Sequence, residues 1–175
     1  TPTTSSAASD VYKRQHFRRR KEMLAKYPQI RKLFGYDTRS SLLITVVVAI
    51  QLIFAWLIQH LLAPLAVGWK IGAVLVSSYF VGALLNHWCA MFIHEATHNL
   101  CAKSPLANKL MAIFSNFPMV IPIAMSFRRY HLLHHAWLGI DDRDRDLPAQ
   151  FELRLIGNKP WRKFLWLLFY LLFYL

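Results

Sequence analysis

Two clusters of histidine are the residues of this sequence best suited to chemistry. The first lies in the motif H-E-A-T-H at residues 94–98, and the second is H-L-L-H-H at residues 131–135. Residues four apart lie on one face of a helix, so the first pair can bind one metal ion together. In the second cluster, spacings of three and four residues let both later histidines align with the first. The candidate metal ligands are therefore His94, His98, His131, His134 and His135.

Five imidazoles narrow the choice of metal centre. They exceed the ligands that one tetrahedral zinc ion with an open position requires. Imidazole suits zinc, copper, iron and nickel alike, so the number of ligands favours two metal ions or one ion of higher coordination. The first motif also matches the zinc-protease pattern H-E-x-x-H, with Glu95 as general base. The second cluster, its tight spacing and the lack of a separate third zinc ligand weigh against a membrane zinc metalloprotease, which stays an alternative. A non-catalytic membrane module would leave the histidines without a role.

A few residues near the clusters are candidates to hydrogen-bond to the ligands and orient them. His87 lies seven residues before His94, on the same helical stripe. It could be a further ligand, a donor to a ligand, or a neutral histidine satisfied by a neighbour such as Asn86. The acidic loop after the second cluster could support that cluster in the same way. The candidate supporting residues are His87, Asn99, Asp141 and Asp144.

Three other residues close to the clusters have simpler expected roles. Cys101 follows His98 by three residues and could approach a metal on the same helix, but a small buried thiol is the expected state of a free cysteine. Arg128 and Arg129 precede the second cluster; they could face lipid headgroups or a redox partner, but solvated positive charges are expected.

Composition and charge indicate a membrane protein. Of the 175 residues, 55% are hydrophobic, which is more than a soluble domain of this length usually contains. Among the 21 Lys and Arg residues, only Lys70 lies between Ser41 and Asn99, so both flanks of the apolar region are expected to face the cytosol. Nucleic acid is not an expected partner of this +12 chain, because the basic residues flank hydrophobic runs and match no reading module.

Two apolar runs are long enough to cross a bilayer as helices. Residues 42–62 contain no Asp, Glu, Lys or Arg, and residues 71–93 form a second run without these charges, after a turn at residues 63–70. The second run returns the chain and places His94 just past the hydrocarbon on the starting side. The sequence thus predicts an all-α integral membrane protein with a transmembrane helical hairpin at residues 41–99 that ends in the first cluster.

The remaining segments divide by composition. Residues 1–15 lack an initiator Met, and residues 10–15 resemble translated sequencing adapter. The segment at residues 1–15 is predicted to be disordered and non-native. Residues 16–40 form a basic amphipathic cytosolic segment, either a helix on lipid headgroups broken near Pro28 or a plain basic tail. Residues 100–160 form a cytosolic or interfacial segment interrupted at Pro118 and Pro122. Residues 161–175 begin a further transmembrane helix that is truncated at the chain end.

Histidine motifs of the forms H-x-x-x-H and H-x-x-H-H at membrane edges resemble the integral-membrane fatty acyl desaturase and hydroxylase superfamily. Outside them, the segment R-K-E-M-L-A-K-Y-P-Q-I at residues 20–30 and S-F-R-R-Y-H at residues 126–131 resemble the sphingolipid Δ4-desaturases, or dihydroceramide desaturases. The motifs N-H at residues 86–87 and H-E-A-T-H-N at residues 94–99 resemble them too. The resemblance runs from about residue 16 to the chain end and continues at Leu138, Gly139, Asp141, Asp144, Asp146, Pro148, Phe151 and Glu152.

This resemblance implies an enzyme with a non-haem di-iron centre, which uses O2 and electrons from NADH through cytochrome b5. It implies trans desaturation of dihydroceramide at C4 to give ceramide, in the endoplasmic reticulum membrane with the histidine boxes on the cytosolic face. The five histidines would be iron ligands. An unactivated C–H bond requires such a cofactor, because side-chain bases cannot remove its hydrogen. Some relatives hydroxylate C4 instead, so a sphingolipid C4-hydroxylase is an alternative, as is a desaturase of another acyl lipid. The family's third histidine box would follow residue 175, so we expect a chain that ends there to be inactive alone.

Overall fold

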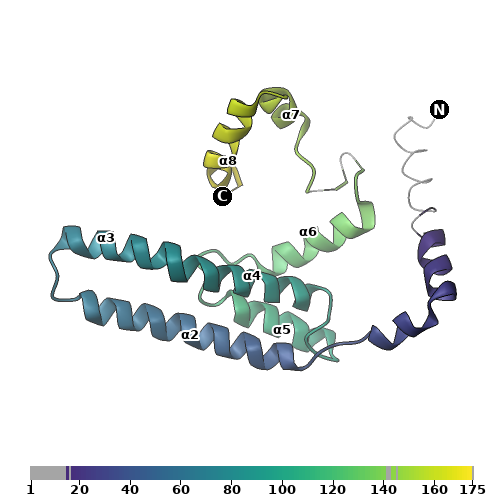
Figure 1. Ribbon diagram of the computed structural model, residues 1–175, viewed down its shortest axis with the longest axis horizontal. Coiled ribbons are helices and arrows are strands. Elements are labelled where there is room, and N and C mark those ends of the chain that lie inside the picture. Colours follow the sequence, from purple (N-terminus) through teal and green to yellow (C-terminus); the bar gives the residue numbers. More distant parts are fainter. Residues whose placement is uncertain (1–14, 16, 141–142, 145, 175) are drawn as a thin grey trace.

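The computed structural model describes residue 15 and residues 17–140, 143–144 and 146–174 (Figure 1). Within these residues the chain forms helices and loops and no strand, which confirms the all-α prediction for this part. The segment predicted to be disordered and non-native, residues 1–15, lies outside the described residues except for residue 15, which is helical and not disordered. The predicted supporting role of Asp141 concerns a residue outside the described ones.

Two long helical rods form the main body. Helix α2 spans Arg39–Leu62, and α3 (Val67–Ser77), the π-helical turn η2 (Ser78–Gly82) and α4 (Ala83–Thr97) follow without a break. Both rods, of 24 and 31 residues, are long and apolar enough to cross a membrane. In Figure 1 they lie side by side, joined by a short turn.

The second rod is longer at both ends than the apolar run predicted at residues 71–93. Gly68, Trp69 and Lys70 lie in the first turn of α3 and not in the connecting turn, because Pro64 is the nearest residue that opposes a helix. At the other end, His94 lies inside the last turn of α4, so the first histidine cluster continues the long helix and does not follow it.

The buried core lies at the histidine end of the rods, where α5 (Pro105–Asn116) and α6 (Ala124–Trp137) pack beside α4. Small side chains let the helices approach closely there, and the hydroxyl of Ser115 on α5 donates to the carbonyl of Cys89 on α4 at 2.9 Å. The outward sides of α2 and α3 instead expose large apolar side chains, as expected of surfaces that contact lipid. The core residues are Ile44, Val47, Val48, Leu85, Cys89, Ile93, Ala96, Cys101, Ala112 and Ala124.

Hydrogen bonds join the beginning of α2 to the chain just after α4. The amide of Asp37 donates to the carbonyl of Leu100 at 2.8 Å, and the hydroxyl of Ser41 donates to the carbonyl of Cys101 at 3.1 Å. The amino end of the first rod and the carboxyl end of the second are therefore adjacent. The first histidine cluster lies at this shared end.

Two buried asparagines shape the loops that lead out of α4 and into α6. Asn108 accepts from the amides of Cys101 and Ala102 at 3.0 and 3.2 Å and donates to the carbonyls of Ala102 and Ser104 at 2.7 and 2.9 Å. Asn116 accepts from the amide of Ala124 at 2.7 Å, which begins α6. These loops therefore have specific side-chain partners for backbone groups that no helix satisfies.

The predicted interruptions occur at prolines. Helix α5 ends at Asn116, and the chain turns through Pro118 and Pro122 before α6 begins. Near the amino end, a helix at residues 17–26 stops before the short 3-10 helix η1 (Pro28–Leu33), which confirms the break near Pro28. After α6, the chain forms α7 (Gln150–Ile156) and α8 (Pro160–Tyr174).

Candidate metal centre

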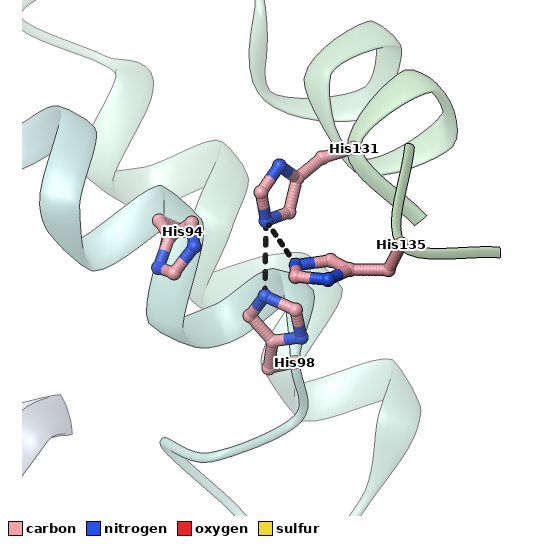
Figure 2. A group of neighbouring side chains, drawn as sticks. All are labelled: His94, His98, His131 and His135. Atoms are coloured by element: carbon pink, nitrogen blue, oxygen red, sulfur yellow. Dashed lines mark hydrogen bonds between the residues drawn. The ribbon is translucent and has the colours of Figure 1, made fainter. Parts of the chain in front are cut away.

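Four of the five candidate ligands converge from two helices. His94 and His98 lie at the carboxyl end of α4, and His131 and His135 lie one turn apart on α6. Figure 2 shows their imidazole rings pointing toward one another. The Nε2 atom of His131 is 3.0 Å from Nε2 of His98 and 3.0 Å from Nε2 of His135. The ring centroids of His94 and His131 are 4.6 Å apart. One nitrogen from each of the four residues lies within 4.8 Å of the others.

This arrangement fits a metal ion better than a hydrogen-bonded cluster. Each imidazole nitrogen carries either one hydrogen or one lone pair, so Nε2 of His131 cannot form good hydrogen bonds with both of its neighbours. Two nitrogens that are each about 2.1 Å from a shared ion, and about 90° apart around it, lie about 3.0 Å from each other. The observed spacings match that geometry. The donor set therefore fits an ion that accepts imidazole ligands.

The surroundings favour the neutral imidazoles that bind metals. Burial, followed by the charges of His94, His135 and His98, lowers the pKa of His131 from 6.5 to about 4. Burial and then the charges of His94 and His135 also lower the pKa of His98. Protonation would place positive charges next to one another in this cluster, which raises its free energy. The imidazoles of the cluster therefore resist protonation and stay in the neutral form that binds a metal ion.

His134 does not join the four-histidine group. A step of three residues along a helix turns a side chain to a different direction from a step of four, and the rings of His131 and His134 are 6.0 Å apart whereas those of His131 and His135 are 4.5 Å apart. His134 faces the loop after α6, where its Nδ1 donates to Oδ1 of Asp144 at 2.8 Å. A second carboxylate oxygen, on Asp146, lies 3.4 Å from the same nitrogen.

Asp144 has the contacts of a residue that orients a ligand. Its side chain is buried and accepts from the amides of Gly139 and Asp146 at 2.8 and 3.0 Å, in addition to His134. Burial raises the pKa of its carboxyl group, but the hydrogen bonds from Gly139, His134 and Asp146 outweigh burial and hold that pKa below its ordinary value. The carboxylate directs Nδ1–H of His134 toward itself and leaves Nε2 as the nitrogen able to bind a metal.

The other candidate residues lie outside the four-histidine group. His87 is exposed on α4, and Oδ1 of its neighbour Asn86 accepts from Nε2 of Gln51 on α2 at 2.6 Å. Cys101 follows the end of α4, so it is not on the same helix as His94 and His98. Its side chain is fully buried. Burial, with the charge of Glu95 adding to it, raises the pKa of the Cys101 thiol to about 11. The expected buried thiol is confirmed.

The sequence interpretation of Arg128 was wrong. Its guanidinium group donates to the carbonyls at the end of α4 and to Asn99, so it is not a solvated charge. The ring of the preceding residue, Phe127, stacks on His131 with centroids 4.9 Å apart and planes 11° apart. Two signals in the sequence could have found these residues: both lie within about one helical turn before His131, and both belong to the motif S-F-R-R-Y-H that resembles the desaturases.

Comparisons with known proteins identify the family of this chain. The family model described as fatty acid desaturase matches residues 68–175, and the model described as sphingolipid Delta4-desaturase matches residues 13–39. A rice (Oryza sativa subsp. japonica) sphingolipid delta(4)-desaturase is 40% identical over 159 residues, which cover 91% of this chain and 46% of the relative. A human sphingolipid delta(4)-desaturase/C4-monooxygenase is 37% identical over 176 residues, which cover 97% of this chain and 52% of the relative.

A Caenorhabditis elegans protein described as a sphingolipid delta(4)-desaturase/C4-monooxygenase is 35% identical over 161 residues, with 91% of this chain and 42% of the relative covered. The chain thus spans about half the length of the curated relatives it matches. No solved structure matches the chain. The fatty acid desaturase model covers more than half of the chain and includes all five candidate ligands. The chain belongs to the fatty acid desaturase family.

Proposed function

We propose that this protein is a sphingolipid Δ4-desaturase that introduces a trans double bond between C4 and C5 of dihydroceramide and so forms ceramide. The observation that carries the proposal is the convergence of His94, His98, His131 and His135 at one end of two membrane-length helices. Such a site can receive a lipid from the bilayer without drawing it into water. Relatives named sphingolipid delta(4)-desaturase support the choice of substrate.

The proposed cofactor is a pair of non-haem iron ions. When bound, iron with O2 supplies the oxidising power that a C–H bond of an alkyl chain requires. His94, His98, His131, His134 and His135 are the proposed ligands, through neutral imidazole nitrogens. Asp144 would keep His134 in the tautomer whose Nε2 faces a metal, since it accepts the Nδ1 hydrogen.

The electron balance explains why an external donor is proposed. Desaturation removes two hydrogen atoms from the lipid, while reduction of O2 to two water molecules consumes four electrons and four protons. Two electrons and two protons come from the lipid. The other two electrons would come from NADH through cytochrome b5, and the other two protons from the solvent. Hydroxylation at C4 uses the same external electrons but transfers one oxygen atom to the lipid and releases the other as water.

The proposed setting is the endoplasmic reticulum membrane. Helix α2 and the α3–α4 rod would form a transmembrane hairpin with both ends cytosolic, because the basic residues lie before α2 and after α4 and only Lys70 lies between. The histidines at the shared end would then face the cytosol, where cytochrome b5 could reach them. Membrane lipid is accordingly the environment as well as the source of substrate.

Two alternatives are weaker. C4-hydroxylation is the nearer one, since human and nematode relatives are named desaturase/C4-monooxygenase. A zinc metalloprotease would use Glu95 as its base, but His131 and His135 lie against His94 and His98 and would crowd a site that needs one further ligand and an open position. Four converging imidazoles favour the oxygen-dependent enzyme.

Expression of the complete protein in cells that lack sphingolipid desaturation tests the proposal. Ceramide with a C4 double bond should appear by mass spectrometry, and His94→Ala should abolish it while His60→Ala, a histidine near the opposite end of α2, should not. Product with a C4 hydroxyl alone would establish the hydroxylase alternative. Purified protein that contains one zinc ion and no iron, or His94→Ala with full turnover, would refute the proposal.

A further inference from the structure

Arg128 belongs to α6 but contacts the end of the other histidine-bearing helix. We infer that Arg128 is a positioning residue that holds the carboxyl end of α4 against α6 and so sets the separation of the two histidine pairs. The inference rests on the proposed metal-binding role of those pairs. It goes beyond that role because it assigns the group that keeps the pairs together.

The carboxyl end of α4 has a defined but incomplete cap. Asn99 has a left-handed backbone with φ of 58°, its amide donates to the carbonyl of Ala96 at 3.1 Å, and the amide of Leu100 donates to the carbonyl of Glu95 at 3.1 Å. This is the Schellman arrangement, which satisfies part of a helix end. A helix leaves its last carbonyls without amide donors, and Thr97 is fully buried from water. The Thr97 carbonyl needs a donor from elsewhere.

The guanidinium group of Arg128 supplies that donor. One of its terminal nitrogens donates to the carbonyls of Ala96 and Thr97 at 2.9 and 2.7 Å, and the other donates to Oδ1 of Asn99 at 3.0 Å. A positive charge is also favourable at the negative end of the helix dipole. The planar fork of Arg reaches all three acceptors together, whereas the single ammonium of Lys has a different geometry. The contact is therefore specific for Arg.

The position of this contact gives it control over the site. Arg128 precedes His131 by three residues on α6, and the carbonyls that it binds belong to residues between His94 and His98 on α4. Movement of α6 along or away from α4 would break these hydrogen bonds. The same movement would separate Nε2 of His98 from Nε2 of His131, now 3.0 Å apart. Loss of a contact that orients metal ligands typically weakens metal binding about 10–100-fold.

The test compares Arg128→Lys with Arg129→Lys, because Arg129 is the next residue on the same helix and its side chain is exposed. The protein is purified metal-free in detergent and titrated with Co²⁺, whose ligand-field bands report the geometry of the bound ion. Separately, spin labels at Met91 on α4 and Met125 on α6, both exposed, give the distance between the helices without metal; the two native cysteines are buried.

Arg128→Lys should weaken Co²⁺ binding about tenfold or more, shift the bands and broaden the distance distribution, whereas Arg129→Lys should change the affinity by less than about twofold. Asn99→Gly removes one of the three acceptors and keeps the left-handed backbone. It should cause a smaller loss of affinity, and no further loss when combined with Arg128→Lys.

Unchanged affinity, bands and distances in Arg128→Lys would overturn the inference. If the unaltered protein binds no Co²⁺, the metal-binding proposal fails, and the distance distribution alone decides about Arg128. A broader distribution in Arg128→Lys then supports its positioning role, and an unchanged one overturns it. If Arg128→Lys loses its helical circular dichroism, the test uses Asn99→Gly instead. Weaker Co²⁺ binding or a broader distance distribution in Asn99→Gly then supports the positioning role of Arg128, and no change in either overturns it.

Discussion

Replacement of Asp144 by Asn tests whether a buried carboxylate orients His134. The exchange keeps the size and shape of the side chain but removes its charge and one acceptor. In the structure, Oδ1 of Asp144 accepts from Nδ1 of His134 and the amide of Asp146, and Oδ2 accepts from the amide of Gly139. An amide offers one acceptor oxygen and one donor nitrogen. Whichever way the new side chain turns, its NH2 group would lie against another donor.

The expected cost follows from that mismatch. A buried donor left without an acceptor costs about 1–3 kcal/mol. With its NH2 group in place of Oδ1 the new side chain would deprive both His134 and the amide of Asp146 of an acceptor; in place of Oδ2 it would deprive the amide of Gly139 and leave His134 a neutral oxygen instead of a carboxylate. In either case His134 is oriented less firmly, and metal affinity should fall about 10–100-fold, typical for the loss of a residue that orients a ligand. That range equals about 1.4–2.8 kcal/mol, which is close to the cost of the unpaired donor. We therefore expect Asp144→Asn to bind metal at least about tenfold more weakly.

Metal titration of the purified protein measures this effect, with Asp146→Asn as the matched control. The Asp146 side chain is 52% exposed and lies farther from Nδ1 of His134, at 3.4 Å. Because Asp146 contributes to the Asp144 site through its backbone amide, its substitution should change affinity little. Equal affinity of Asp144→Asn and the unaltered protein, or a greater loss in Asp146→Asn, would refute the assignment of Asp144 as the orienting residue.

Three further predictions concern stability. Asn108→Ala should lower the free energy of unfolding by about 2–3 kcal/mol, because buried backbone groups of the loop after α4 lose their partners, and thermal unfolding should show no comparable loss for the exposed Asn158→Ala. Gln51→Leu breaks a contact between α2 and α4 and should cost about 0.6 kcal/mol in detergent; a gain in stability would contradict this. The metal-free protein should become less stable as pH falls from 6.5 toward about 4, because the unfolded state binds a proton at His131 that the folded state resists, and the slope should be smaller in His131→Asn. A melting temperature that is constant over this range would count against the burial of His131.

The main features of the fold follow from local sequence. Apolar runs of membrane length predict helices whatever their neighbours, since lipid and protein interiors both require satisfied backbone groups. Pro28, Pro118 and Pro122 end or separate helices at the predicted places because proline lacks the amide hydrogen and clashes with the preceding turn. The exact ends of the second rod were not predictable. No proline ends a helix at residues 67–70, the cost of Gly68 is small, and the mean hydropathy changes there although the helix continues.

The local part of the candidate metal centre was also predictable. His94 and His98, and likewise His131 and His135, are four residues apart, and helix geometry alone brings each pair to one face. The family resemblance of the motifs to desaturases, confirmed by the family model, added the chemistry that spacing left open.

What only the tertiary structure decided is how those two local pairs meet and what keeps them together. Periodicity treats His134 and His135 as equivalent partners of His131, but the crossing of α6 over α4 turns His135 to the group and His134 to Asp144. In the sequence, Arg128 is one more basic residue next to Arg129, and nothing local indicates a partner. In the structure it binds carbonyls that lie 32 and 31 residues earlier in the chain. A sequence determines which side chains share a helical face because that geometry is local. Contacts between helices depend on packing and on loops such as those held by Asn108 and Asn116, so only the folded chain specifies them.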